Sequence, residues 1–187
     1  MGIKHFEIEN YEADDIIGTL AKRVDEEDEF IATIVSSDKD LLQLISPHVN
    51  IKLLKQKDYI YYTEETFIKD YGINPINIID LKALMGDASD NIPGVKGVGE
   101  KTAIKLISEY KTIENLYDHI DEIKGKLQEK LILDKENAFF SKKLATILLD
   151  VPIKDTFNDM EYKGANIDLL TNIFEELEFY SFIYTVL

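Results

Sequence analysis

The chain has 187 residues, with 36 Asp or Glu against 21 Lys or Arg, a formal net charge of -15 and no cysteine. Without cysteine, a disulfide framework, a thiolate metal site and a cysteine nucleophile are excluded. The negative charge argues against a protein that coats nucleic acid, although it allows a local binding site. The longest uncharged apolar run, Phe30–Ser37, is far shorter than the roughly 20 residues of a membrane-spanning helix, so we expect a cytoplasmic protein with no membrane partner.

The first 72 residues predict alternating strands and helices. Period-two or β-branched patterns predict strands at 5–9, 30–35, 49–54 and 59–62. Helical spacing predicts a helix over 11–26, a short helix through Leu41–Ile45 and a helix that Thr63 caps. The strand at 30–35 is expected to be buried and parallel. Together these elements predict an α/β fold with a partial parallel sheet.

After Gly72 the hydrophobic period becomes helical. Helices are predicted from Asn74 through Met85, from Thr102 to Tyr110 and onward to about Leu149. Val151–Phe157 predicts an edge strand with Pro152 near its start, and Asp168–Leu177 predicts a final amphipathic helix. The expected divisions are part of an α/β core at 1–85, a helical lobe at 86–150, and a strand and helix at 151–187 that pack back on the core.

Seven carboxylates fall into three groups along the chain. They are Glu12, Asp14 and Asp15; Asp38 and Asp40; and Asp87 and Asp90. Each group alone has an ordinary structural explanation, as acids at a helix start, as a helix cap or as an Asx turn. Together they are expected to meet, because loops at the carboxyl ends of parallel strands build the sites of α/β folds.

Carboxylates gathered in one crevice require cations, and oxygen ligands without His or Cys favour Mg²⁺ or Mn²⁺. Two such ions about 4 Å apart can support cleavage of a phosphodiester bond. Glu12 with Asp15 would share a helix face, as would Asp87 with Asp90 if their segment is helical. Asp38 and Asp40 share a face if the preceding strand continues.

A glycine-rich segment over 91–103 predicts a second site. Its spacing, G-x-x-G-x-G, differs from that of dinucleotide-binding loops. A helix ending near Asp90, a glycine hairpin and a helix starting near Glu100 would expose backbone N–H groups beside a positive helix end, which suits phosphate. Lys101 and Lys105 share a face of the second helix. The alternative is an ordinary corner between helices. Phosphate contacts read no bases, so binding would be independent of sequence.

Four stretches at these positions resemble the 5′-nuclease family, which includes flap endonucleases and 5′-to-3′ exonucleases such as the exonuclease domains of bacterial type I DNA polymerases. The stretches are YEADD at 11–15, SDKDL at 37–41, GDASDNIPGV at 86–95 and GVGEKTA at 97–103. The resemblance implies a PIN-like α/β sheet followed by a helical lobe with a helix-hairpin-helix-type (H3TH) motif.

The resemblance also implies an activity and its residues. It implies hydrolysis of the 5′ strand at flaps, nicks and gaps in DNA replication and repair, through two Mg²⁺ or Mn²⁺ ions. It implies that the metal-binding, catalytic acids are Glu12, Asp14, Asp15, Asp38, Asp40, Asp87 and Asp90. It implies sequence-independent DNA contacts from Gly94, Lys96, Gly97, Gly99, Lys101, Thr102 and Lys105. It further implies a monovalent cation, K⁺, at Val95 and Val98.

One feature departs from the family pattern. Family members begin with a strand that carries a further metal-binding Asp and then a basic helical arch, and neither is expected before Glu12. We therefore expect a portion of the nuclease domain, associated with the nucleoid and continuous with polymerase domains in the full-length protein. Two hypotheses follow: a metal-dependent 5′-nuclease, or a non-catalytic fragment that grips duplex DNA through 94–105.

Overall fold

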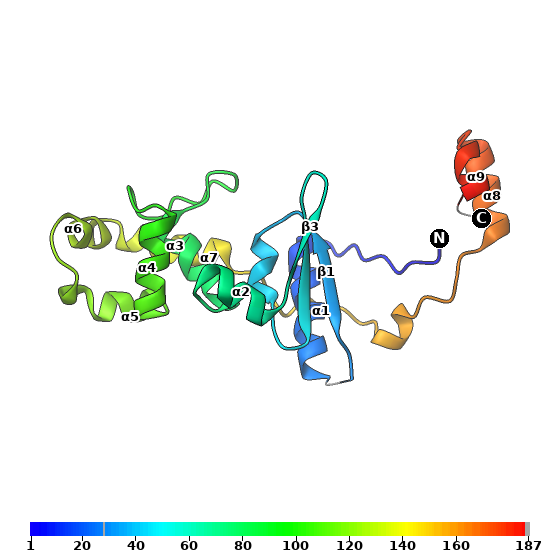
Figure 1. The fold of residues 1–187 in the computed structure, drawn as a ribbon. Helices are drawn as coiled ribbons and strands as arrows, with labels where there is room; N and C mark the ends of the chain where they lie inside the picture. The colour runs from blue at the N-terminus through cyan, green and yellow to red at the C-terminus, as the bar shows by residue number, and fades with distance from the viewer. Residues whose placement is uncertain (28, 186–187) are drawn as a thin grey trace. The chain divides into compact units, whose positions relative to one another are not determined.

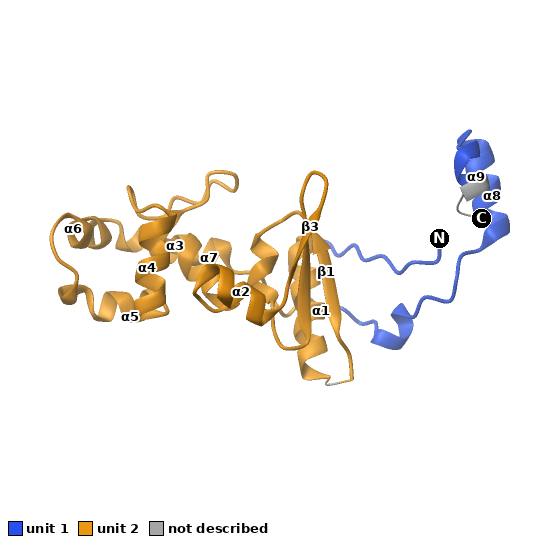
Figure 2. Ribbon diagram, viewed as in Figure 1, with its two compact units in different colours: residues 1–10, 152–187 blue, residues 11–151 orange. Residues whose placement is uncertain are grey.

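The computed structural model describes residues 1–27 and 29–185 of the chain. They form two compact units, one of residues 11–151 and the other of residues 1–10 and 152–187 (Figure 2). No helix within these described ranges is long and apolar enough to cross a membrane. The predicted three-part division of the chain stays a prediction.

The larger unit begins with a small sheet and the helices beside it (Figure 1). In chain order these elements are α1 (Ala13–Glu26), β1 (Ala32–Ser36), η1 (Asp40–Leu44), β2 (Val49–Leu54) and β3 (Tyr59–Tyr62). β1 pairs with β2 in parallel, with Ile34 opposite Ile51, and β3 runs antiparallel to β2. These elements confirm the predicted first helix, the short 3-10 helix after β1 and the last two strands.

Three predictions about the strands are wrong. Residues 5–9 and 151–157 form no strand, because alternating side chains do not hold an extended segment that has no neighbouring strand for its backbone hydrogen bonds. β1 is parallel as predicted, but it lies at an edge of the described sheet and is not buried: Val35 is 58% exposed.

The rest of the larger unit is helical, and α3 lies at its centre. Its elements are α2 (Glu64–Tyr71), η2 (Pro75–Asn77), α3 (Ile78–Met85), α4 (Glu100–Tyr110), α5 (Ile113–Asp118), η3 (Ile120–Glu122), α6 (Lys126–Leu133) and α7 (Lys135–Ala145). α3 packs against α4, α5 and α7, and every residue from Ile78 to Leu84 is buried. The helical pattern ends at Ala145, earlier than the predicted Leu149, because residues 146–149 cross beside α1 without helical hydrogen bonds.

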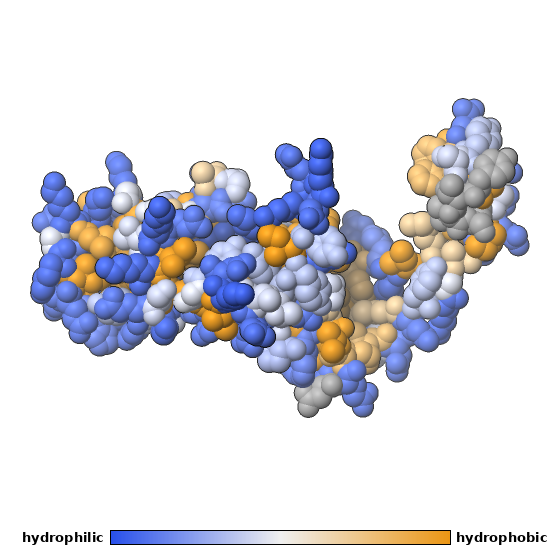
Figure 3. Space-filling model, in the orientation of Figure 1, coloured by the Kyte–Doolittle hydropathy of each residue, from blue (hydrophilic) through white to orange (hydrophobic). Residues whose placement is uncertain are grey.

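The smaller unit contains η4 (Phe157–Met160), α8 (Ile167–Glu176) and α9 (Tyr180–Thr185). α8 confirms the predicted final amphipathic helix, whereas α9 was not predicted. An ion pair between Lys4 and Asp155 joins the two segments of this unit. Its surface carries exposed apolar side chains such as Leu169 and Phe182. Figure 3 shows hydrophobic residues at the surface of this unit.

A buried ion pair ties three helices of the larger unit together. The Asp80 carboxylate on α3 accepts hydrogen bonds from the Ile113 N–H at 3.0 Å and from the Lys142 ammonium at 2.7 Å, and its side chain is 5% exposed. Replacing Lys142 by Met leaves that charge unpaired, so we expect a loss of about 3 kcal/mol in the free energy of unfolding. Urea unfolding measures this loss.

A surface pair provides the control for this prediction. Lys163 lies 3.7 Å from Glu161 and both side chains are mostly exposed. Lys163→Met should change the free energy of unfolding by less than about 1 kcal/mol. Equal losses in the two variants would show that Asp80 does not depend on Lys142.

Candidate functional site

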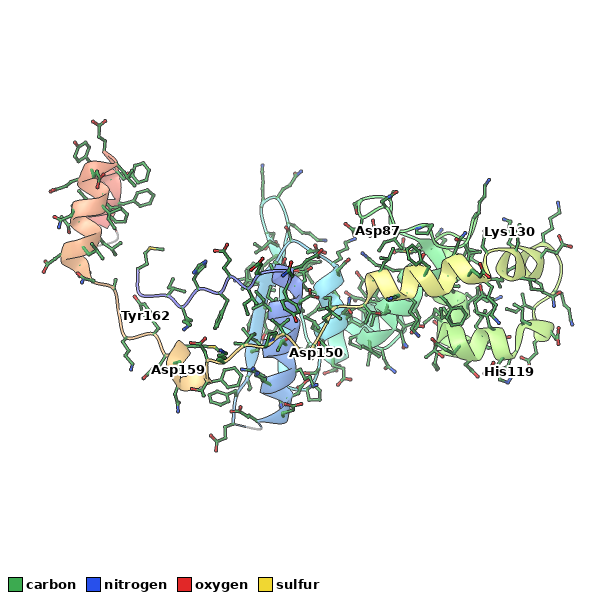
Figure 4. All side chains as sticks on the ribbon, turned by 180° about the vertical axis from the view of Figure 1, so that it is seen from behind. Asp87, His119, Lys130, Asp150, Asp159 and Tyr162 are labelled. Atoms are coloured by element: carbon green, nitrogen blue, oxygen red, sulfur yellow. The ribbon has the colours of Figure 1, made fainter. Side chains whose placement is uncertain are left out.

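The three acidic groups come from three separate elements of the larger unit. Glu12 is the N-cap of α1 and Asp14 lies in its first turn. Asp38 and Asp40 follow the end of β1, at the start of η1. Asp87, labelled in Figure 4, lies with Asp90 on the loop between α3 and α4. The predicted convergence of these groups can therefore be tested by their geometry.

Most of these acids line one open cavity of about 410 Å³. Its lining contains Glu12, Asp14, Asp38, Asp40 and Asp90, with Ile92 and Leu144. Burial, and then repulsion from Asp38 and Asp40, raises the pKa of Asp14. The cavity is thus an acidic crevice whose carboxylates repel one another when no cation is present.

Three carboxylates form a tighter group within this arrangement. Asp40, Asp87 and Asp90 each offer an oxygen, and these oxygens lie within 4.8 Å of one another. Mg²⁺ binds oxygen ligands at about 2.0–2.1 Å, so ligands on opposite sides of the ion are about 4 Å apart. The three carboxylates fit a hard divalent cation in both chemistry and spacing.

Lys82 lies inside this group and is not among the residues predicted from the sequence. It projects from α3, is only 5% exposed, and its ammonium contacts Asp40, Asp87 at 2.7 Å and Asp90 at 3.4 Å. A signal for it existed, because α3 is apolar at most positions and a lysine in such a helix must find buried partners.

The shared ammonium affects the acids differently. Hydrogen bonds from Lys82 and then from Ser89 lower the pKa of Asp87 to about 2. Burial raises the pKa of Asp40, and its contact with Lys82 offsets this only in part. Burial alone would lower the pKa of Lys82, but hydrogen bonds to Asp40 and Asp87 outweigh it and raise that pKa. Lys82 and Asp87 therefore stay charged at neutral pH.

The lowered pKa of Asp87 predicts a pH-dependent contribution to stability. Because its folded-state pKa of about 2 lies below the ordinary 3.8, the stabilisation is present above about pH 4 and is lost as the pH falls toward about 2. In EDTA, Asp87→Asn should lower the free energy of unfolding more at about pH 6 than at about pH 3. Urea unfolding at both pH values measures this; a difference that does not change with pH would contradict it.

The loop that carries Asp87 is a tight turn and not the helix considered from the sequence. α3 ends at Met85, and reciprocal hydrogen bonds between the backbones of Asp87 and Ile92, at 2.8 and 2.9 Å, close the turn. A Cβ on Gly94 would lie 2.3 Å from the backbone nitrogen of Gly86. Both glycines have positive φ, so this crossing requires glycine and fixes where Asp87 points.

Asp38 and Asp40 come together in a different way from the predicted one. β1 ends at Ser36, so the strand does not continue through them. Instead, the Asp40 N–H donates to the Asp38 carboxylate at 2.8 Å, and the Asp38 N–H donates to the Ser36 hydroxyl at 3.0 Å. This local turn, which Asp side chains favour, directs the two acids to the crevice.

Asp15 uses its carboxylate for two structural hydrogen bonds. One of its carboxylate oxygens accepts the Leu148 N–H at 3.0 Å, and the other accepts the Glu12 N–H at 3.2 Å. It does not line the acidic crevice. Asp15 thus closes the capping box of α1 and anchors the segment after α7, while its predicted role as a metal ligand stays a prediction.

The glycine hairpin divides into a buried half and an exposed half. Gly94 is buried and its N–H donates to the fully buried Ser141 hydroxyl at 2.9 Å, so this N–H is not available to phosphate. The Lys96 N–H donates to the Asp134 carboxylate at 2.8 Å, and the side chain of Lys96 is exposed. The N–H groups of Gly94 and Lys96 therefore anchor the hairpin to α7 and to Asp134, the residue before that helix.

The exposed half contains the groups that suit an anion. Gly97 and Gly99 are exposed, and their N–H groups have no acceptor among the residues that the structure describes. Lys101 and Lys105 are exposed on α4, which begins at Glu100 as predicted. The N–H of Thr102 donates to the Gly99 carbonyl at 3.0 Å, within the first turn.

Two carbonyl groups of the hairpin accept hydrogen bonds from other groups of the chain. The Val95 carbonyl accepts the Val98 N–H at 3.0 Å, and both valines are buried. The Gly97 carbonyl accepts a hydrogen bond of 3.2 Å from the ammonium of Lys130, which is labelled in Figure 4. A monovalent cation at Val95 and Val98 stays a prediction.

Family models match almost the whole chain. Residues 1–72 match the 5'-3' exonuclease N-terminal resolvase-like domain, and residues 73–168 match the 5'-3' exonuclease C-terminal SAM fold. DNA polymerase I of Bacillus caldotenax is 50% identical over 184 residues, which are 97% of this chain and 21% of that protein. The chain thus spans about a fifth of the length of such relatives.

Solved structures are similar over the larger part of the chain. T5 5'-exonuclease with bound divalent metal ions (zinc) superposes with a TM-score of 0.63 at 26% identity, over 75% of this chain and 51% of that one. The T5 D15 flap endonuclease in a complex with DNA and metal ions gives a TM-score of 0.64 at 24% identity, over the same shares, which shows the fold alone. These similarities confirm the predicted α/β fold with a following helical lobe.

Proposed function

Because the chain belongs to the 5'-3' exonuclease family, we propose that it forms part of a metal-dependent nuclease that hydrolyses phosphodiester bonds in the 5′ strand of DNA. The observation that carries the proposal is the group formed by Asp40, Asp87 and Asp90, which fits a divalent cation. The similarity to DNA polymerase I and to a metal-bound T5 5'-exonuclease supports the same chemistry.

Two sets of carboxylates would hold the metal ions. Asp40, Asp87 and Asp90 form one set, and Glu12, Asp14 and Asp38 line the crevice beside it. Mg²⁺ or Mn²⁺ bound there supplies an activated water and stabilises charge on the leaving oxygen. Asp40 and Asp90 belong to the first set and also line the crevice, so their carboxylates link the two sets.

The chain itself determines where these carboxylates point. The Asp87 turn is closed by backbone hydrogen bonds, and Asp38 is hydrogen-bonded to the backbone of Asp40. The backbone that carries these acids therefore needs little reorganisation when a cation enters. Because the pKa of Asp14 is raised, protons compete with the metal for this carboxylate at low pH.

The hairpin and α4 would hold the DNA. The free N–H groups of Gly97 and Gly99 and the start of α4 suit phosphate oxygens, and Lys101 and Lys105 add positive charge on the same helix. These groups meet only the backbone of a nucleic acid, so binding would be independent of base sequence.

Lys82 favours a second candidate function. Its ammonium already compensates part of the charge of the three-carboxylate group, so the fold does not require a metal. A chain that grips duplex DNA through the hairpin without cutting it would show salt-sensitive binding that survives loss of the acids.

A labelled 5′-flap DNA distinguishes the two functions. Binding is measured in Ca²⁺, and cleavage in Mg²⁺ or Mn²⁺ at matched low salt, with EDTA and Asp87→Ala as controls. Cleavage that disappears in both controls supports the nuclease. Binding without cleavage supports the gripping fragment, and the absence of both would refute the two candidates together.

A further inference from the structure

The ammonium of Lys82 lies where a cation would lie. It contacts the same three carboxylates whose oxygens are spaced for a divalent ion, Asp40, Asp87 and Asp90. An ammonium hydrogen bond is about 2.8 Å long and a Mg–O bond about 2.0–2.1 Å, so the same three carboxylates suit either cation with a small adjustment. Both cannot be at the centre of the group at once, because they are positive charges that would repel at this distance.

A cavity beside the group, which Asp40 and Asp87 also line, offers space for a second position of this side chain. This cavity, of about 270 Å³, has Lys82 in its wall together with the apolar side chains of Leu42, Leu81 and Met85 and the carboxylate-bearing Glu100. The four methylenes of a lysine stem can lie along apolar walls while the ammonium reaches a carboxylate. Lys82 can therefore leave the three-carboxylate group without entering a purely apolar environment.

From these contacts we infer that Lys82 is an internal cation that neutralises the Asp40, Asp87 and Asp90 group in the metal-free protein and must leave it when a divalent metal binds. The inference rests on the proposed metal site. Lys82 thus stabilises the metal-free fold and, by the same contacts, weakens metal binding, because the metal has to replace three existing interactions.

Lys82→Met tests this competition, since methionine has nearly the length of lysine without its charge. The probe is Mn²⁺, titrated by calorimetry, with thermal unfolding in EDTA and in saturating Mn²⁺. The variant should bind Mn²⁺ about tenfold more tightly than the wild type, because no ammonium has to be displaced. Its unfolding temperature should fall in EDTA and recover in Mn²⁺.

Two lysines serve as matched controls. Lys39 is exposed and lies near Asp40 without contacting the group, so Lys39→Met reports the general effect of losing a nearby charge. It should change the Mn²⁺ affinity less than about threefold. Lys142 contacts Asp80 and Glu114 outside the site, so Lys142→Met should lower the unfolding temperature equally in EDTA and in Mn²⁺.

The outcomes separate the inference from the metal site. If the wild type binds Mn²⁺ and Lys82→Met binds it no more tightly, the competition is refuted while the metal site stands. If neither protein binds Mn²⁺, the metal site fails and the inference fails with it. Lys82→Gln, which keeps a hydrogen-bond donor without charge, should tighten Mn²⁺ binding in the same direction and replaces the Met variant if that variant does not fold.

Discussion

Asp40→Asn is expected to reduce metal-dependent cleavage by more than about a hundredfold and to weaken Mn²⁺ binding by at least about tenfold. Asp40 lines the acidic crevice with Asp14 and Asp38, and it belongs to the three-carboxylate group with Asp87 and Asp90. Removing its charge therefore takes a ligand from the three-carboxylate group and a negative charge from the crevice. Asn keeps the size and one oxygen, so the loss reports on charge more than on packing.

Calorimetric titration with Mn²⁺ measures the affinity, and the labelled flap assay measures the cleavage. If the chain binds DNA without cutting it, the Mn²⁺ affinity alone tests the role of Asp40. Asp118→Asn is the control, because Asp118 is an exposed acid at the end of α5 and the variant carries the same change of charge. An unchanged Mn²⁺ affinity in Asp40→Asn would remove Asp40 from the metal site.

Much of the fold could be predicted because local signals determine it. The capping box of Thr63 and Thr66 begins α2. The helical period predicts Ile104 and Ile107 inward on α4, where Ile107 is buried and Ile104 is half-buried. Strands at 5–9 and 151–157 failed because a strand depends on a partner that local pattern does not reveal. The prediction that β1 is buried failed for the same reason, because its sequence pattern does not specify which layer covers it. Val35 is exposed in the structure.

The sequence predicts which segments carry the acids of the site, but not all of the contacts that these acids make. Acids after a strand and at a helix start meet because the topology brings those ends together, and the crevice lined by Glu12, Asp14 and Asp38 has this origin. Asp15 differs from its neighbours through a local hydrogen bond from the Glu12 N–H and a tertiary one from the distant Leu148 N–H. The charge compensation by Lys82 likewise depends on the packing of α3 against elements far apart in sequence.

Charge reversal on α4 should have the largest effect on DNA binding. Lys101→Glu with Lys105→Glu should weaken binding to duplex DNA on the order of a hundredfold at low salt, because two phosphate contacts are lost and two repulsive charges replace them. The slope of log Kd against log salt should fall by about two, one for each lost contact. Fluorescence anisotropy in Ca²⁺ at several salt concentrations gives both quantities.

Lys22→Glu with Lys69→Glu separates this local effect from net charge. Both lysines are exposed, on α1 and α2, and the double variant has the same net charge as the first. Since DNA is repelled by the whole acidic protein as well as by local charges, some loss is expected here too, but the salt slope should stay unchanged because no phosphate contact is removed. If both double variants lose affinity and slope equally, DNA does not bind at the hairpin. If only the α4 variant loses slope, the phosphates lie along Gly97, Gly99 and the first turns of α4.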